Sequence, residues 1–291
     1  MSGVVTLKRN RAKPVLQRHP WVFSGAIQRI EGEMADGDVV DVRDAGGNWL
    51  ARGTLNRHSQ IAVRLLTWRQ DKPVDLAFWQ RRIERAIAAR QALAGDPVTT
   101  AYRLVHAESD YLPGLIVDRY GEWLVVQLLT LGAERWKEPL VDLLASLADG
   151  VRGVYERSDV DVRAKEGLPQ RTGPLWGEEP PELVEVLENG HRFLVDVRQG
   201  HKTGFYLDQR ENRARLPAFC DGAEVLDVFA YTGGFGVYAM GGGASQVTLV
   251  ESSAPALDLA RRNLAFNGLD RRGAEYVEGD VFSVLRGYRA Q

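Results

Sequence analysis

Short alternating runs of apolar and polar residues fill the first quarter of the chain. Asp38–Arg43 and Asn48–Leu55 both alternate with the period of two that is typical of β-strands, and Gly46-Gly47 between them suits a hairpin turn. Gln60–Leu66 continues the same pattern. We therefore predict a small all-β domain over residues 1–70.

A helical pattern opens the middle of the chain. Leu76, Trp79 and Ile83 recur at the spacing of one helix face. Beyond residue 100, strand-like strings such as LIVDRY alternate with the helix-like AERWKEPLVDLLASLA, until a stretch rich in glycine and proline runs from Gly167 to Pro181. This pattern predicts a central α+β linking domain over residues 71–182.

The last part of the chain changes pattern again. Asn189-Gly190 separates two alternating apolar runs, which is a strong hairpin signal. From Ala223 onward strands and helices alternate, and this order is typical of parallel strands in a doubly wound sheet. Only eleven residues follow Asp280. We therefore predict the first half of a doubly wound α/β sheet over residues 183–291, and a mixed fold for the chain as a whole.

Composition limits the class of protein. The chain is 44% hydrophobic and 26% charged, as in ordinary globular proteins. No apolar run reaches the ~18 residues of a membrane helix, and the N-terminus lacks the apolar core of a secretory signal, so we expect a cytoplasmic protein without membrane contact. The single cysteine, Cys220, excludes an internal disulfide and a multi-cysteine zinc site. We expect no metal site.

Charge is distributed unevenly. Residues 1–70 carry 11 Lys and Arg against 6 Asp and Glu, a net charge of +5, although the whole chain has a net charge of -2. Clustered basic side chains gain from neutralising phosphates, so this segment suggests an arm that binds a polyanion. A solvated face that only keeps the protein soluble would have the same charge.

Acidic residues follow each of the three predicted parallel strands. Asp227 ends the first strand, Glu251 the second, and Asp280 follows the third. Because ligands of doubly wound sheets bind at the carboxyl ends of the strands, these acids are candidate ligand contacts. A carboxylate after the second strand can accept both hydroxyl protons of a ribose. The alternative for each acid is a helix N-cap or a solvated loop charge.

The glycine loop between the first strand and its helix fits two cofactors. Gly234 to Ala239 matches the dinucleotide fingerprint G-x-G-x-x-A, which would indicate NAD and an oxidoreductase. Asp227 opposes this interpretation, because its carboxylate would repel a pyrophosphate but could pair with the ammonium group of an amino acid. The loop therefore favours S-adenosylmethionine (SAM).

Three strings carry a family resemblance over nearly the whole chain. VLDVFAYTGGFGVYA, GHKTGFYLDQRENR and VYERSDVDVRAKEGL resemble the large-subunit (23S) rRNA cytosine-C5 methyltransferases. Members of that family join an N-terminal PUA domain, a central linking domain and a class I, Rossmann-like SAM-dependent methyltransferase domain. The resemblance implies an RNA-binding rRNA-processing transferase that uses SAM and forms 5-methylcytosine, with a PUA-like barrel at its N-terminus.

The resemblance also implies positions for the sites. Cofactor contacts are expected at Thr203, Phe205, Tyr206, Gln209, Arg210, Asp227, Phe229, Tyr231, Thr232, Gly233, Gly234, Phe235, Glu251, Ser252, Asp280 and Val281. Contacts to the RNA backbone are expected at Arg9, Arg11, Lys13, Arg18 and Lys202.

Further side chains have two interpretations each. Trp21 and Phe23 could stack on bases or fill the core of a small barrel. Phe205 and Tyr206 could stack on a base, or fill the core while Asp208 caps a helix. Lys202, Arg210 and Arg213 could contact phosphate. Arg157, Arg163 and Lys165 could extend a basic track toward the active site, or they could equally be solvated.

One departure from the family concerns catalysis. Methylation at C5 requires a nucleophile that adds to C6, and a thiolate suits this step. In the family, that cysteine and an Asp-Pro-Pro type of loop lie beyond the third-strand acid, and neither occurs in these 291 residues. Cys220 precedes the first strand and is expected to pack as a small apolar residue. We therefore expect a truncated chain that has no catalytic residue of its own and does not methylate cytosine alone.

Two other functions stay open from the sequence. The chain could be an RNA-binding protein whose methyltransferase-like domain is only structural, or an NAD-linked oxidoreductase. The sequence leaves the target nucleotide and the oligomeric state open, a homodimer included.

Overall fold

The computed structural model describes residues 3–270 and 273–290, and these form two compact units. Unit 1 comprises Met1–Ala92 and Arg103–Pro180, and unit 2 comprises Leu93–Tyr102 and Pro181–Gln291. The division into domains at residues 1–70, 71–182 and 183–291 stays a prediction.

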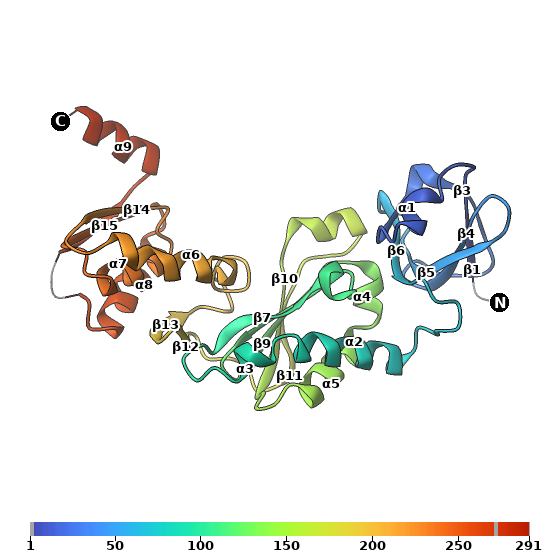
Figure 1. The fold of residues 1–291 in the computed structure, drawn as a ribbon, viewed down its shortest axis with the longest axis horizontal. Coiled ribbons are helices and arrows are strands. Elements are labelled where there is room, and N and C mark those ends of the chain that lie inside the picture. The colour runs from blue at the N-terminus through green and yellow to red at the C-terminus, as the bar shows by residue number, and fades with distance from the viewer. Residues whose placement is uncertain (1–2, 271–272, 291) are drawn as a thin grey trace. The chain divides into compact units, whose positions relative to one another are not determined.

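The N-terminal part of unit 1 is a six-stranded sheet, as its alternating pattern predicts (Figure 1). The strand order is β2-β6-β5-β4-β1-β3, and the only parallel neighbours among its described strands are β1 and β4. Inward-facing Val5, Val42 and Val63 are fully buried and form part of its core. The elements are β1 (Gly3–Leu7), α1 (Lys13–Leu16), β2 (Trp21–Phe23), η1 (Ser24–Ala26), β3 (Ile27–Glu31), β4 (Val39–Arg43), β5 (Trp49–Leu55) and β6 (Ile61–Thr67).

The middle of the chain forms a five-stranded sheet in the order β11-β10-β9-β8-β7. Strands β9 and β10 are buried along their whole length, because helices pack on this sheet. Strands and helices alternate here as predicted. The elements are α2 (Leu76–Ala88), α3 (Gln91–Ala94), β7 (Ala101–His106), η2 (Ala107–Asp110), β8 (Leu115–Tyr120), β9 (Trp123–Leu128), α4 (Leu131–Arg135), α5 (Lys137–Leu147), β10 (Gly153–Ser158), η3 (Asp161–Glu166) and β11 (Arg171–Gly177).

Unit 2 contains the predicted hairpin. β12 (Val184–Glu188) and β13 (His191–Val195) pair antiparallel around Asn189 and Gly190, whose φ angles are 48° and 84°. Positive φ at both central residues confirms the turn expected from Asn-Gly. Thr100 of unit 2 joins the hairpin, because its amide donates to the Leu187 carbonyl at 2.8 Å and its hydroxyl accepts the Leu187 amide at 2.8 Å.

The remainder of unit 2 is a parallel β14-β15-β16 sheet with crossover helices, as the β-α-β-α-β pattern predicts. Ser253 caps α8 by accepting the Ala256 amide. The three strands run in one direction, so their carboxyl ends share one edge. The elements are η4 (Leu207–Gln209), α6 (Arg210–Arg215), η5 (Leu216–Phe219), β14 (Glu224–Val228), α7 (Gly234–Gly241), β15 (Gln246–Glu251), α8 (Ala254–Phe266), β16 (Ala274–Glu278) and α9 (Val281–Ala290).

Candidate functional site

A pocket of about 500 Å³ lies within unit 2, at the carboxyl ends of β14 and β15. Ten of the sixteen predicted cofactor contacts line it, from three segments that are distant in the sequence. The lining residues are His201, Phe205, Tyr206, Gln209, Arg213, Phe229, Ala230, Tyr231, Thr232, Gly234, Phe235, Glu251 and Ser252.

Six predicted contacts lie outside this lining. Thr203 is buried, and Gly233 is the N-cap of α7 with a φ of 75°. Arg210 donates to Glu211 at 3.0 Å. Asp280 accepts the amide and the hydroxyl of Ser283 at 2.9 and 2.8 Å, so it caps α9, whose first residue is the buried Val281. Asp227, the sixth, binds the backbone of α7.

Asp227 stabilises the start of α7. Its Oδ2 accepts the Gly236 amide at 3.0 Å, in the first turn of the helix, where the helix dipole favours a negative charge. Burial nevertheless raises the pKa of Asp227 to about 6, and the nearby Glu251 carboxylate adds to this, while the Gly236 hydrogen bond lowers the pKa. The carboxyl group is therefore close to its titration point near neutral pH.

Glu251 shapes the glycine loop. Its Oε2 accepts the Tyr231 amide at 2.9 Å, and its Oε1 accepts the Ser252 and Ser253 amides at 2.8 and 3.0 Å. Only 9% of the residue is exposed, and it lines the pocket. The Ser252 hydroxyl also donates to Oε1, at 3.2 Å. Oε2 accepts only the Tyr231 amide among the described residues, so Glu251 can still accept a hydrogen bond from a ligand at Oε2.

Tyr231 holds the GHKTGFYLDQR segment against the loop. Its hydroxyl accepts the His201 amide at 2.8 Å and donates to the Gly204 carbonyl at 3.0 Å. The rings of His201 and Tyr231 stack with centroids 4.6 Å apart, and the Tyr206 ring meets Tyr231 edge-on. His201 lines the pocket but was not among the predicted cofactor contacts, although it lies in the GHKTGFYLDQR string that contains five of them.

The pocket residue Thr232 has a buried hydroxyl group without a hydrogen-bond partner among the described residues. Thr232 is 4% exposed, and its Oγ1 has no hydrogen-bond partner in the part of the chain that the structure describes. Its carbonyl accepts from Asn263 at 3.0 Å, which fixes the residue between loop and helix. A buried hydroxyl without a partner is costly, so it favours a ligand that can hydrogen-bond to it.

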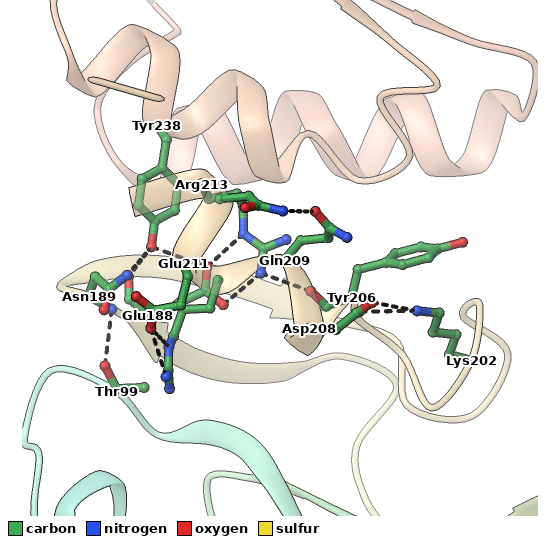
Figure 2. Close-up of polar contacts among 12 residues, drawn as sticks. Thr99, Glu188, Asn189, Lys202, Tyr206, Asp208, Gln209, Glu211, Arg213 and Tyr238 are labelled. Atoms are coloured by element: carbon green, nitrogen blue, oxygen red, sulfur yellow. Dashed lines mark hydrogen bonds and ion pairs between the residues drawn. The ribbon is translucent and has the colours of Figure 1, made fainter. Parts of the chain in front are cut away.

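Arg213, one of the residues that line the pocket, forms a buried ion pair with Glu188 (Figure 2). Arg213 donates to both oxygens of Glu188 at 2.7 Å and to the Tyr206 carbonyl at 3.0 Å. The Tyr238 hydroxyl donates to Glu188 Oε1 at 3.1 Å and accepts from Asn189 at 2.9 Å. Burial, with the Glu188 charge in second place, raises the pKa of Tyr238.

This pair corrects the sequence-based interpretation of Arg213. The prediction that Arg213 meets phosphate is wrong, because the side chain is 2% exposed and its guanidinium lies over the Phe205 ring at 4.5 Å, bound to Glu188. The prediction of Asp208 as an N-cap is also wrong. Tyr206 and Gln209 occupy the cap positions, and Asp208 accepts from Lys202 at 3.0 Å, as Figure 2 shows.

The proposed RNA contacts lie on exposed surfaces. Arg9, Arg11, Lys13, Arg18 and Lys202 are all exposed. Arg11 lines a second pocket, of about 380 Å³, together with His19, Trp21 and Phe23. By contrast, Arg157 and Arg163 are 4% and 0% exposed, so the prediction that they extend a basic track is wrong. Arg163 instead donates to Glu134 and to the Pro169 carbonyl.

The single cysteine has the packing role that the sequence predicts. Cys220 is fully buried, its thiol donates to the Leu216 carbonyl at 3.3 Å, and burial raises its pKa. Among the described residues no group of side chains could hold a metal ion, and no helix is long and apolar enough to cross a membrane. The cytoplasmic location stays a prediction.

Family models match both ends of the chain. A PUA-like domain matches residues 5–68, and an S-adenosylmethionine-dependent methyltransferase matches residues 162–289. The predicted cofactor, SAM, is thereby confirmed over NAD. The match over residues 5–68 also confirms the PUA-like N-terminal domain.

Curated relatives match the chain from end to end. "Ribosomal RNA large subunit methyltransferase I" from Photobacterium profundum is 50% identical over 290 residues, which are 99% of this chain and 73% of the relative. The protein of the same name from Aeromonas hydrophila is 48% identical with the same coverage. The chain thus spans about three quarters of the length of these relatives.

Solved structures share the fold. A SAM-dependent methyltransferase from Streptococcus mutans has a TM-score of 0.85 at 24% identity, over 100% of this chain and 74% of that one. A methyltransferase complexed with S-adenosylhomocysteine (SAH) has a TM-score of 0.87 at 24% identity, over 100% and 73% of the two chains. These likenesses establish the arrangement of the elements.

Proposed function

Because the chain belongs to the ribosomal RNA large subunit methyltransferase I family, we propose that it serves to methylate C5 of a cytosine in large-subunit rRNA. The observation that carries this proposal is the pocket, which combines the glycine loop, the GHKTGFYLDQR string and Glu251 at the carboxyl edge of the parallel sheet. Support for the C5 atom comes from the sequence resemblance of those strings to cytosine-C5 enzymes.

The residues of the pocket fit SAM. Its volume is in the range of ligand sites, its walls carry Phe205, Tyr206 and Phe235, and Thr232 offers a hydroxyl that has no partner among the described residues. We propose that Glu251 accepts a ribose hydroxyl at Oε2 and that Asp227 faces the ammonium group, directly or through water. When bound, SAM supplies an electrophilic methyl group on a sulfonium.

We propose that Asp280 accepts a hydrogen bond from the adenine amino group. Glu278 is the register partner of Glu251 on β16, and the Gly279 amide donates to the Glu251 carbonyl at 3.0 Å. Asp280 therefore follows β16 at the same edge of the sheet as Glu251. Its bond to Ser283 uses one carboxylate oxygen and leaves the other to a ligand.

Cys220 does not supply the nucleophile that adds to C6. A thiolate must form and reach the base, whereas the Cys220 thiol is fully buried and its pKa is raised. We assign no described residue to that role. For RNA we propose that the exposed Arg9, Arg11, Lys13 and Arg18, together with Lys202, contact the backbone, because exposed Lys and Arg side chains neutralise phosphate.

Calorimetry with SAH tests the cofactor site. Glu251→Gln replaces one acceptor oxygen by an amide donor and removes the charge, so SAH should bind roughly 10- to 150-fold more weakly, the equivalent of about 1.5–3 kcal/mol. Glu224→Gln is the matched control, since Glu224 is exposed at the opposite end of the same sheet. If Glu251→Gln and Glu224→Gln bind SAH with equal affinity, Glu251 does not contact the cofactor and has only a structural role.

Nucleoside analysis tests the methylated atom. Large-subunit rRNA is isolated from cells of the source organism with and without the gene, digested to nucleosides and compared by mass spectrometry. We expect one 5-methylcytosine to disappear with the gene. Loss of a different methylated nucleoside, with every 5-methylcytosine retained, would show that the C5 assignment is incorrect.

A further inference from the structure

A second cationic surface lies in the middle part of unit 1, away from the N-terminal basic residues in the sequence. Helix α2 carries Arg82 and Arg85, and Tyr111 follows the short helix η2. The guanidinium carbons lie 4.8 and 5.6 Å from the centre of the Tyr111 ring. We call these three residues the α2–η2 surface.

The two arginines of this surface have no acidic partner among the described residues. They are three residues apart, so they are neighbours on one helix face and their charges repel. Neither forms an ion pair within residues 3–270 and 273–290, and Arg82 donates one side-chain hydrogen bond, to the Leu66 carbonyl at 2.9 Å. Asp110, beside Tyr111, is held by Arg90 at 2.7 Å. Arg85 is exposed, whereas Arg82 is half-buried and its guanidinium carbon also lies 4.9 Å from the centre of the Phe78 ring. The N–H donors of Arg85 above all therefore remain open to an anion.

Tyr111 combines a strained backbone conformation with an exposed side chain. Tyr111 has a φ of 59°, in the left-handed region that bulky residues avoid, and its side chain is among the exposed large hydrophobic ones, at 42%. Such strain persists only where surrounding bonds impose it and is concentrated at functional sites. Here the Tyr111 amide donates to the Glu108 carbonyl at 3.0 Å.

Hydrogen bonds join this surface to the PUA-like domain. Glu108 of η2 accepts from Trp21 Nε1 at 2.8 Å and from Arg64 at 3.2 Å. Arg82 donates to Leu66, which lies in β6. Trp21 also lines the N-terminal pocket that contains Arg11. The PUA-like domain and the α2–η2 surface therefore belong to the same unit, so one polyanion could contact both.

We propose that the α2–η2 surface binds the phosphate backbone of the rRNA, as a second RNA contact outside the PUA-like domain. The inference rests on the proposed rRNA substrate. Arginine suits this role because its planar group of N–H donors matches phosphate oxygens. Tyr111 contacts both guanidinium groups with its ring, and 42% of the residue is exposed.

Salt-dependent binding of an in vitro large-subunit rRNA transcript tests the inference. Arg85→Gln should bind about 5- to 8-fold more weakly at about 0.1 M salt, with a plot of log affinity against log salt that is shallower by about 0.7–0.9, as expected for one lost phosphate contact. Arg81→Gln is the matched control, because Arg81 is exposed on the same helix, whereas the guanidinium groups over the Tyr111 ring are those of Arg82 and Arg85. Tyr111→Asn should weaken binding as well, and asparagine tolerates the left-handed backbone.

The outcomes separate this inference from the proposed function. SAH affinity should be the same in all variants, because the cofactor pocket lies in unit 2. If Arg81→Gln weakens RNA binding as much as Arg85→Gln, only net charge matters and the inference fails. If Arg85→Gln binds RNA like the wild type, the inference fails as well. If the wild-type chain does not bind the transcript, the rRNA part of the proposed function fails too.

Discussion

Replacing Glu188 with glutamine would leave a charged guanidinium without its counterion in the interior of unit 2. Glu188 and Arg213 are 1% and 2% exposed, and two 2.7 Å hydrogen bonds join them. Breaking a buried ion pair from one side costs about 3–5 kcal/mol, because the remaining charge has lost its solvation in water and its partner. Against a typical stability of about 5–15 kcal/mol for a domain, this is a large share.

The magnitude follows from charge rather than from lost hydrogen bonds. In Glu188→Gln the new side-chain carbonyl can still accept from Arg213 and from the Tyr238 hydroxyl, which donates to Glu188 at 3.1 Å in the native protein. A net neutral hydrogen bond is worth only about 1 kcal/mol. With a urea dependence of about 2 kcal/mol per molar, a loss of about 3–5 kcal/mol lowers the unfolding midpoint by about 1.5–2.5 M.

The positions of the tryptophans allow the unfolding of the two units to be followed separately. All seven tryptophans lie in unit 1, at positions 21, 49, 68, 79, 123, 136 and 176, so tryptophan fluorescence follows that unit alone. Far-ultraviolet circular dichroism follows both units. In Glu188→Gln we expect the circular dichroism transition to gain an early phase in urea while the fluorescence transition stays where it is in the wild type.

Glu185→Gln is the matched control for Glu188→Gln. Glu185 lies on the same strand β12 and pairs with Arg192 at 2.7 Å, but the two side chains are about half exposed, at 52% and 47%. An exposed pair contributes about 0–1 kcal/mol. A cost below about 1 kcal/mol for Glu188→Gln, or one equal to that of Glu185→Gln, would refute the argument from burial.

Two further predictions concern single titratable groups. Since burial raises the pKa of Asp227 from 3.8 to about 6, its stabilising contribution is complete below pH 3.8 and is lost as the pH rises through about 6. As the pH rises from 3.8 through about 6, the free energy of unfolding measured in urea should fall for the wild type relative to Asp227→Asn. A difference between the two free energies that stays constant with pH would contradict the raised pKa. The fully buried Cys220 should react with a thiol reagent only after unfolding, and rapid labelling of the native chain would contradict its burial.

The strand-end acids illustrate what a sequence pattern can predict. A β-α-β-α-β order implies parallel strands, and parallel strands put their carboxyl ends on one edge, so Glu251 could be assigned to the pocket from its position alone. The hairpin at Asn189-Gly190 was predictable for a similar reason, because few residues other than Asn and Gly tolerate the required φ angles.

Arg213 illustrates what the pattern could not predict. Its neighbours in the sequence suggested an exposed basic residue, but its position in the fold is decided by Glu188, which lies 25 residues earlier on another element. Arg163 was misjudged in the same way, since Glu134 and the Pro169 carbonyl bind its guanidinium in the interior. Burial of a charge depends on a partner brought close by folding, and local periodicity contains no information on that partner.

The glycine loop shows why both kinds of reasoning are needed. Its glycines alone fit either a pyrophosphate or a methionine moiety, and it was Asp227 before them that favoured the methionine moiety in the sequence. In the structure, Asp227 binds the Gly236 amide beyond the loop and Glu251 binds the Tyr231 amide within it, so the two acids fix the loop through its own backbone. Their proximity contributes to the raised pKa of Asp227. We propose that a cationic group bound there relieves that repulsion, whereas a pyrophosphate would add to it, so that the charges of Asp227 and Glu251 favour a methyl donor with an ammonium group.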